Sequence, residues 1–142
     1  DQDIDLSDIK SNTDREEIFK TTQIVTALDA KTIGTTPIVL LAAPGAGVVR
    51  DIVKVFVEIL WGSVAFQGNS AGIYANGSSD ALYTFSSGLM NSVVDEIWVG
   101  QKGASHPNTL IRNAALQWEG SDSVATGDST FKFYIWYTDT TM

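Results

Sequence analysis

The 142-residue sequence predicts an all-β fold, an antiparallel β-sandwich of jelly-roll type that follows an extended N-terminal arm. From Ile18 onward, β-branched and aromatic runs are separated by Gly, Asn, Asp, Ser and Pro, which is typical of many short strands. No helix is expected after Ile18, and the length corresponds to one domain. We expect strands at residues 18–27, 37–43, 48–61, 64–67, 72–74, 81–85, 96–99, 109–119 and 130–138.

Charge separates the first residues from the rest of the chain. Residues 1–17 hold seven acidic and two basic side chains, so they carry −5 of the total net charge of −8. Three isolated apolar residues, Ile4, Leu6 and Ile9, are too few to bury a face of this segment. We therefore expect residues 1–17 to form an acidic arm, disordered in isolation or lying along another subunit, and residues 18–142 to form the β-sandwich domain.

Turn-forming residues mark the connections between the expected strands. Residues 44–47, Pro-Gly-Ala-Gly, resemble the start of a phosphate-binding loop, but no Lys-Ser/Thr pair and no helix follow. We interpret them as a tight turn. Residues 86–95 are expected to form a loop or a single turn.

Two of the expected strands are apolar on both faces. Side chains alternate along a strand, so the C-terminal strand presents Phe131, Phe133, Ile135 and Tyr137 on one face and Lys132, Tyr134, Trp136 and Thr138 on the other. The run from Ile52 to Trp61 presents Val53, Val55, Val57, Ile59 and Trp61 on one face and Ile52, Lys54, Phe56, Glu58 and Leu60 on the other.

An antiparallel sandwich normally has a polar outer face, so the second apolar face indicates a further packing partner. We expect a subunit interface around a symmetry axis, with a trimer favoured over a dimer. The alternative is a central strand in a thick sandwich, with a loop folded over its outer face. The interface candidates are Ile4, Leu6, Ile9, Tyr134 and Trp136.

Residues for catalysis or for metal binding are scarce. The chain has no Cys and a single histidine, His106, which excludes thiolate sites and two-histidine zinc sites. Asp1, Asp3 and Asp5 match the start of a calcium loop, but the Gly and the Glu required later in that loop are missing. Asp95 and Glu96 are adjacent and point to opposite faces of a strand. The sequence predicts no enzyme, no metal site and no cofactor.

Composition also limits the partners. The chain has nine basic residues and seventeen acidic ones, too few basic residues to bind the phosphate backbone of a nucleic acid, so no nucleic-acid partner is expected. Arg50, Asp51, Lys54 and Glu58 interrupt the longest apolar stretches, so no membrane partner is expected. Four tryptophans remain open to two interpretations, a glycan-binding groove or burial in cores and interfaces. They are Trp61, Trp98, Trp118 and Trp136.

Three segments carry a resemblance to a known family. Residues 36–49 read TPIVLLAAPGAGVV, residues 111–116 read IRNAAL, and residues 126–137 read TGDSTFKFYIWY. In this order they resemble a family of small β-sandwich structural proteins of tailed bacteriophages. The resemblance implies a virion component, in capsid decoration, head fibres or tail appendages, and brings no catalytic residues with it.

From this resemblance we expect a non-enzymatic decoration or cement protein on the capsid exterior, which clamps neighbouring capsid subunits as a homo-oligomer. Its partner would be the major capsid protein or another virion protein. The alternative is a fibre or tail-appendage module that binds a receptor or a glycan.

Overall fold

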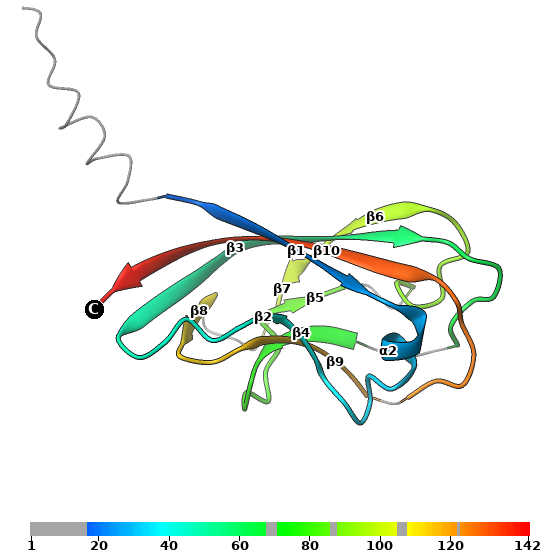
Figure 1. The fold of residues 1–142 in the computed structure, drawn as a ribbon, viewed down its shortest axis with the longest axis horizontal. Coiled ribbons are helices and arrows are strands. Elements are labelled where there is room, and N and C mark those ends of the chain that lie inside the picture. Colours follow the sequence, from blue (N-terminus) through cyan, green and yellow to red (C-terminus); the bar gives the residue numbers. More distant parts are fainter. Residues whose placement is uncertain (1–16, 68–70, 86–87, 105–107, 122) are drawn as a thin grey trace, which may run out of the picture.

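Two antiparallel β-sheets lie face to face in the computed structural model, which describes residues 17–67, 71–85, 88–104, 108–121 and 123–142 (Figure 1). Sheet A contains, in order, β1 (Phe19–Val25), β10 (Thr130–Thr141), β3 (Val48–Leu60) and β6 (Glu96–Val99), and β8 (Leu110–Arg112) also pairs with β3. Sheet B contains, in order, β2 (Ile38–Leu41), β9 (Leu116–Gly120), β4 (Ala71–Ala75), β5 (Tyr83–Thr84) and β7 (Gln101–Lys102). The predicted all-β sandwich is confirmed.

The winding of the chain is that of a jelly roll. The chain passes from β1 in sheet A to β2 in sheet B, returns to A for β3, and crosses to B for β4 and β5 before β6 returns to A. The resulting orders, β1-β10-β3-β6 and β2-β9-β4-β5, place the first and last strands side by side. The jelly-roll prediction is therefore also confirmed. The predicted arm, apart from Glu17, lies outside the described residues, as do Ile4, Leu6, Ile9, the Asp1–Asp5 segment and His106.

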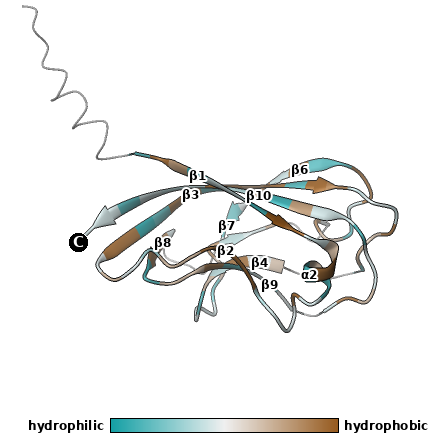
Figure 2. Ribbon diagram, viewed as in Figure 1, coloured by the Kyte–Doolittle hydropathy of each residue, from teal (hydrophilic) through white to brown (hydrophobic). Residues whose placement is uncertain are grey.

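The core fills the space between the sheets. On β10, Phe131, Phe133 and Ile135 are fully buried, as the predicted alternation requires. Trp118 of β9 meets them from sheet B, with its ring 5.0 Å from the ring of Phe131 and 4.9 Å from that of Phe133, measured between centroids. Figure 2 shows hydrophobic and hydrophilic residues mixed along β3 and β10, whose other face is not part of this core.

A β-bulge changes the predicted faces of β3. Trp136 pairs with Lys54, but Tyr137 pairs with Ile52, so Val53 is an extra residue without a partner on β10. Ile52 therefore turns into the core, at 0% exposure, while Val53 is 43% exposed. The prediction that Ile52 and Val55 lie on different faces of the strand was wrong, because it assumed an unbroken alternation of side chains. The Ile52 carbonyl oxygen accepts a hydrogen bond of 2.6 Å from the Tyr83 hydroxyl of sheet B.

Several predicted boundaries were also wrong. Residues 64–67 form no strand, and the expected strand at 109–119 is divided into β8 and β9, with Asn113 at a φ of 46° between them. β7 was not predicted, since two residues give too little pattern to detect. The prediction of no helix after Ile18 was wrong: a short helix, α2 (Ala27–Lys31), follows β1. The Thr26 side chain caps it by accepting a hydrogen bond from the Asp29 amide at 3.3 Å.

The glycine-containing turns were predicted correctly. Gly45 and Gly47 have φ angles of 104° and 78°, and the chain continues directly into β3 rather than into a helix. This geometry confirms a tight turn at residues 44–47. In residues 88–95 the described backbone makes single turns, and Leu89 and Met90 are buried under them.

Candidate interaction face

The outer side of sheet A carries a cluster of aromatic and charged side chains. Residues opposite each other on antiparallel strands share a face. Trp136 faces Lys20 on one side and Lys54 on the other, and Tyr134 faces Phe56. We call this cluster the aromatic–lysine face; its members are Lys20, Lys54, Phe56, Glu58, Lys132, Tyr134 and Trp136.

Three aromatic rings form the centre of the aromatic–lysine face. The Phe56 and Trp136 rings pack edge to face, with centroids 5.1 Å apart. The Tyr134 and Trp136 rings are nearly parallel, at 25°, with centroids 6.4 Å apart. Beside them lies a shallow hollow of about 240 Å³, to which Ile97 also contributes. The rings thus offer apolar surface on the side of the sheet away from the core.

The lysine ammonium groups lie over these rings. The Lys54 Nζ is 4.3 Å from the centroid of Trp136 and 5.1 Å from that of Phe56. The Lys20 Nζ is 5.9 Å from Trp136 and 5.8 Å from Tyr134, and the Lys132 Nζ is 5.3 Å from Tyr134. At these distances each ammonium group is attracted by the electron-rich face of a ring. The result is a surface that is both aromatic and cationic.

Glu58 is the acidic member of the aromatic–lysine face. Its Oε1 accepts a hydrogen bond of 3.1 Å from the Tyr134 hydroxyl, which orients the Tyr134 ring. The seven members together carry three positive charges and one negative charge, a net charge of +2 in a chain whose total is −8.

Figure 1 shows no described segment lying over the outer side of sheet A. Ile24 of β1 and Ile97 of β6 border the aromatic–lysine face and are 56% and 64% exposed. Among the described residues, therefore, no loop folds over the outer face of β3 and β10, as the alternative interpretation required.

A larger, acidic hollow of about 420 Å³ borders the same strands. It is lined in part by Glu58, Asp95 and Glu96. Asp95 accepts a hydrogen bond of 2.7 Å from the Trp61 amide, and Glu96 accepts one from the Ser92 hydroxyl. These bonds hold the loop before β6. The part of the chain described by the structure contains no group of three possible metal ligands and no helix long enough to span a membrane.

The outer face of sheet B is different. Tyr74 and Glu119 line a hollow of about 180 Å³ there, and partial burial raises the pKa of Glu119. No lysine takes part in this hollow. The two outer faces of the sandwich therefore differ in chemistry.

The motif segments that suggested the family form loop anchors. Asp128 accepts hydrogen bonds from the Ser63 amide, the Ser63 hydroxyl and the Val64 amide, at 2.7, 2.7 and 2.8 Å. These bonds lower the pKa of Asp128 below its ordinary value of 3.8. Gly127, at a φ of 128°, lies against Phe66, and a Cβ there would be 2.3 Å from the Phe66 ring. The Gly-Asp pair thus holds the loop that follows β3.

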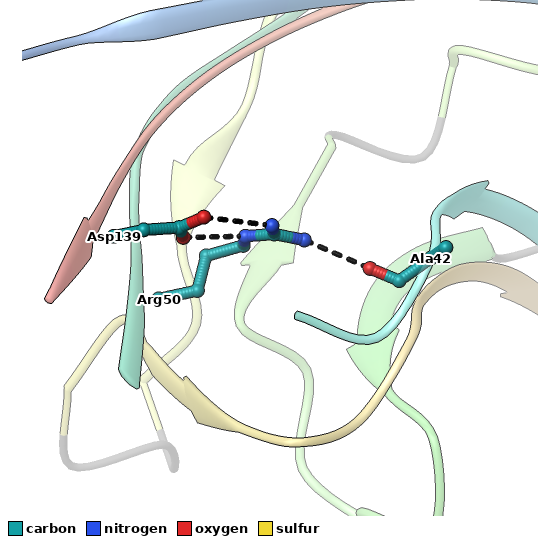
Figure 3. Close-up of polar contacts among 3 residues, drawn as sticks. All are labelled: Ala42, Arg50 and Asp139. Atoms are coloured by element: carbon teal, nitrogen blue, oxygen red, sulfur yellow. Dashed lines mark hydrogen bonds and ion pairs between the residues drawn. The ribbon is translucent and has the colours of Figure 1, made fainter. Parts of the chain in front are cut away.

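Arg50 forms a second anchor, at the end of the sandwich where β10 ends (Figure 3). Its guanidinium donates to both carboxylate oxygens of Asp139 and to the carbonyl oxygen of Ala42. The guanidinium carbon is also 4.4 Å from the centroid of the Tyr137 ring. The sequence analysis did not identify Asp139 as a partner of Arg50, because the two residues are 89 positions apart and no local pattern links them.

Two of the predicted interface residues, Tyr134 and Trp136, lie next to each other on the aromatic–lysine face. The sequence pattern placed Lys54 and Phe56 together on a face of their strand but did not identify them as part of a site. Lys20 was missed. A signal was present in the alternation of lysine and aromatic residues at 132, 134 and 136.

The four tryptophans do not share a groove. Trp118 is fully buried, and Trp98 packs against the core with its ring nitrogen enclosed. Trp136 is the tryptophan of the aromatic–lysine face. The interpretation that placed tryptophans in cores is therefore confirmed for Trp98 and Trp118.

The fold has a counterpart among solved structures. A chain in the capsid asymmetric unit of cyanophage Pam1 superposes with a TM-score of 0.53, over 86% of this chain and 84% of that chain, at 12% identity. The two chains are similar in fold. No protein-family model matches the sequence, and no curated protein matches it significantly.

Proposed function

We propose that this chain is a non-enzymatic structural protein of a phage virion, and specifically a decoration or cement protein on the capsid exterior. The observation that carries the proposal is the jelly-roll fold, shared over most of both lengths with a chain of the Pam1 capsid asymmetric unit. The phage-protein resemblance of residues 36–49, 111–116 and 126–137 supports the same role. The partner is the major capsid protein or another virion protein.

A cement protein acts by adding buried surface across the joints between capsid subunits. Because it binds the assembled shell and not the separate subunits, it stabilises the shell by mass action. A rigid jelly roll suits this task, since little conformational freedom is lost when it binds. The bonds of Asp128, Asp95 and Arg50 add to this rigidity by holding loops and strand ends in place.

The protein acts as a homo-oligomer in this proposal, with a trimer favoured over a dimer. The aromatic–lysine face is the proposed contact surface, because it presents three aromatic rings outside the core. Aromatic side chains are enriched in the centres of protein interfaces.

The test compares particles with and without the protein. Particles that lack it should assemble, but release their DNA at a lower temperature, because the clamp stabilises only the assembled shell. Unchanged heat release together with failed adsorption to cells would contradict the cement role.

That second pattern would instead support a receptor- or glycan-binding module of a fibre or tail appendage. The hollow beside Phe56, Tyr134 and Trp136 is the observation that favours this alternative, since aromatic faces stack on sugar rings. The net charge of +2 on the same face favours the cement proposal, because a positively charged surface suits an acidic protein partner better than a neutral sugar.

A further inference from the structure

The charge of the aromatic–lysine face limits what can cover it. The face carries Lys20, Lys54 and Lys132 against Glu58 alone, a net charge of +2. If two copies packed this face against itself, six ammonium groups would meet two carboxylates. Like charges brought together in an interface oppose association. The partner surface must therefore be acidic as well as apolar.

Residues 1–17 of the chain have this composition. They carry a net charge of −5 and include the apolar residues Ile4, Leu6 and Ile9. The remaining residues carry a net charge of only −3. The acidic arm is thus complementary to the aromatic–lysine face in both charge and hydrophobicity.

The spacing of the arm's apolar residues matches the spacing of the rings. In an extended chain, residues i and i+2 point to the same side and are about 6.7 Å apart. Ile4 and Leu6 have this separation in sequence, and the Tyr134 and Trp136 ring centroids are 6.4 Å apart. An extended arm can place one aliphatic side chain near each ring. By the same alternation Asp3 and Asp5 point to the other side of the extended arm, so the lysines attract the arm through its overall negative charge.

The direction of β1 favours the arm of a second copy. β1 is an edge strand of sheet A, and it starts at Phe19, one residue before Lys20 of the aromatic–lysine face. Continued straight, a chain preceding β1 runs away from this face, and an extended segment of this length reaches about 50 Å. The chain's own arm would have to reverse its direction to return. An arm from a neighbouring copy meets no such constraint.

We infer that the acidic arm of one copy, residues 1–17, docks on the aromatic–lysine face of a second copy. Ile4 and Leu6 lie on the rings of Tyr134 and Trp136, and the negative charge of the arm is attracted to Lys20, Lys54 and Lys132. This inference rests on the homo-oligomer of the proposed function but not on its place in a virion. Exchanged arms would join the copies of the oligomer.

The experiment uses the full chain with a photoreactive benzoylphenylalanine in place of Leu6. Equal amounts of this protein, unlabelled, and of ¹⁵N-labelled wild type are mixed, incubated to exchange subunits and irradiated. Mass spectrometry then identifies the linked peptides. We expect links from position 6 of the unlabelled chain to labelled peptides that contain Phe56, Tyr134 or Trp136.

Three other outcomes would overturn the inference. Links to the aromatic–lysine face found only within the unlabelled copy would mean that each arm folds back on its own body. Links to peptides of sheet B would mean that the arm docks elsewhere. No links would mean that position 6 of the arm is not docked on the protein. Because purified protein is used, none of these results depends on the particle experiment that tests the cement role.

A matched pair of variants tests the role of charge. Lys54→Glu combined with Lys132→Glu in the labelled partner should reduce the yield of these links several-fold, and high salt should have the same effect on the wild type. Lys102→Glu, at an exposed lysine of β7 in sheet B, should leave the yield unchanged. Equal yields for the double variant and the control would overturn the electrostatic part of the inference. Circular dichroism checks that each variant is folded.

Discussion

The Arg50 guanidinium and the Asp139 carboxylate form a bidentate ion pair between the neighbouring strands β3 and β10, with N–O distances of 2.8 and 2.9 Å. The third guanidinium nitrogen donates to the Ala42 carbonyl oxygen at 2.8 Å, just after β2. One largely buried side chain therefore connects β3 and β10 of sheet A to the segment that leaves sheet B. The planar donor geometry of arginine makes this three-way contact possible.

Replacing Asp139 by Asn should lower the free energy of unfolding by about 1–3 kcal/mol, because the guanidinium loses a charged partner in a partly buried position. Urea denaturation followed by tryptophan fluorescence measures the change. Asp80→Asn is the control, since Asp80 is exposed. Equal stability of the two variants would show that the Arg50–Asp139 pair contributes nothing.

The Asp128 carboxylate predicts an acid-dependent loss of stability. Hydrogen bonds from Ser63 and Val64 lower its pKa in the folded chain below the ordinary value of 3.8. The stabilisation is complete above that value and is lost as the pH falls through the lower, folded-state pKa. Asp128→Asn should therefore be less stable than the wild type at pH 7, and the difference should shrink in acid. Denaturation curves across this range measure it, and a constant difference would contradict the prediction.

Replacing Trp136 by Glu should produce monomers. The substitution removes a central ring of the proposed contact. It also places a carboxylate between Lys20 and Lys54, which weakens the attraction of these lysines for an acidic partner. Light scattering at micromolar concentration measures the mass. Tyr74→Glu, at a half-buried aromatic residue on the outer face of sheet B, should not change it. A monomeric wild type would contradict the oligomer proposal itself.

Alanine substitutions at Gly127 and Gly77 distinguish two energetic costs of an added methyl group, backbone strain and a steric clash. Both have positive φ angles, but a Cβ on Gly77 meets no atom within 4 Å, whereas one on Gly127 meets the Phe66 ring at 2.3 Å. Gly77→Ala should cost about 1–2 kcal/mol from backbone strain alone. Gly127→Ala should cost a further amount of about 1–3 kcal/mol from the clash. Thermal unfolding measures both, and equal losses would contradict the close packing of Phe66.

The fold class could be predicted from local sequence patterns, because strand formation and alternation are local properties of neighbouring residues. The period-two pattern of residues 131–135 identified core side chains correctly, and the glycines at 45 and 47 marked a turn. It also identified Tyr134 and Trp136 as aromatic residues on the face away from the core.

The pairing of the strands could not be predicted from local patterns and became visible only in the folded chain. The bulge at Val53 depends on the register between β3 and β10, which no local pattern specifies, and it moves Ile52 into the core. The partners Arg50 and Asp139 are 89 residues apart, and Lys20 joins Trp136 because the first and last strands are neighbours in the jelly roll. These relationships depend on contacts between distant segments, and such contacts are set by the packing of the whole chain rather than by the order of adjacent residues.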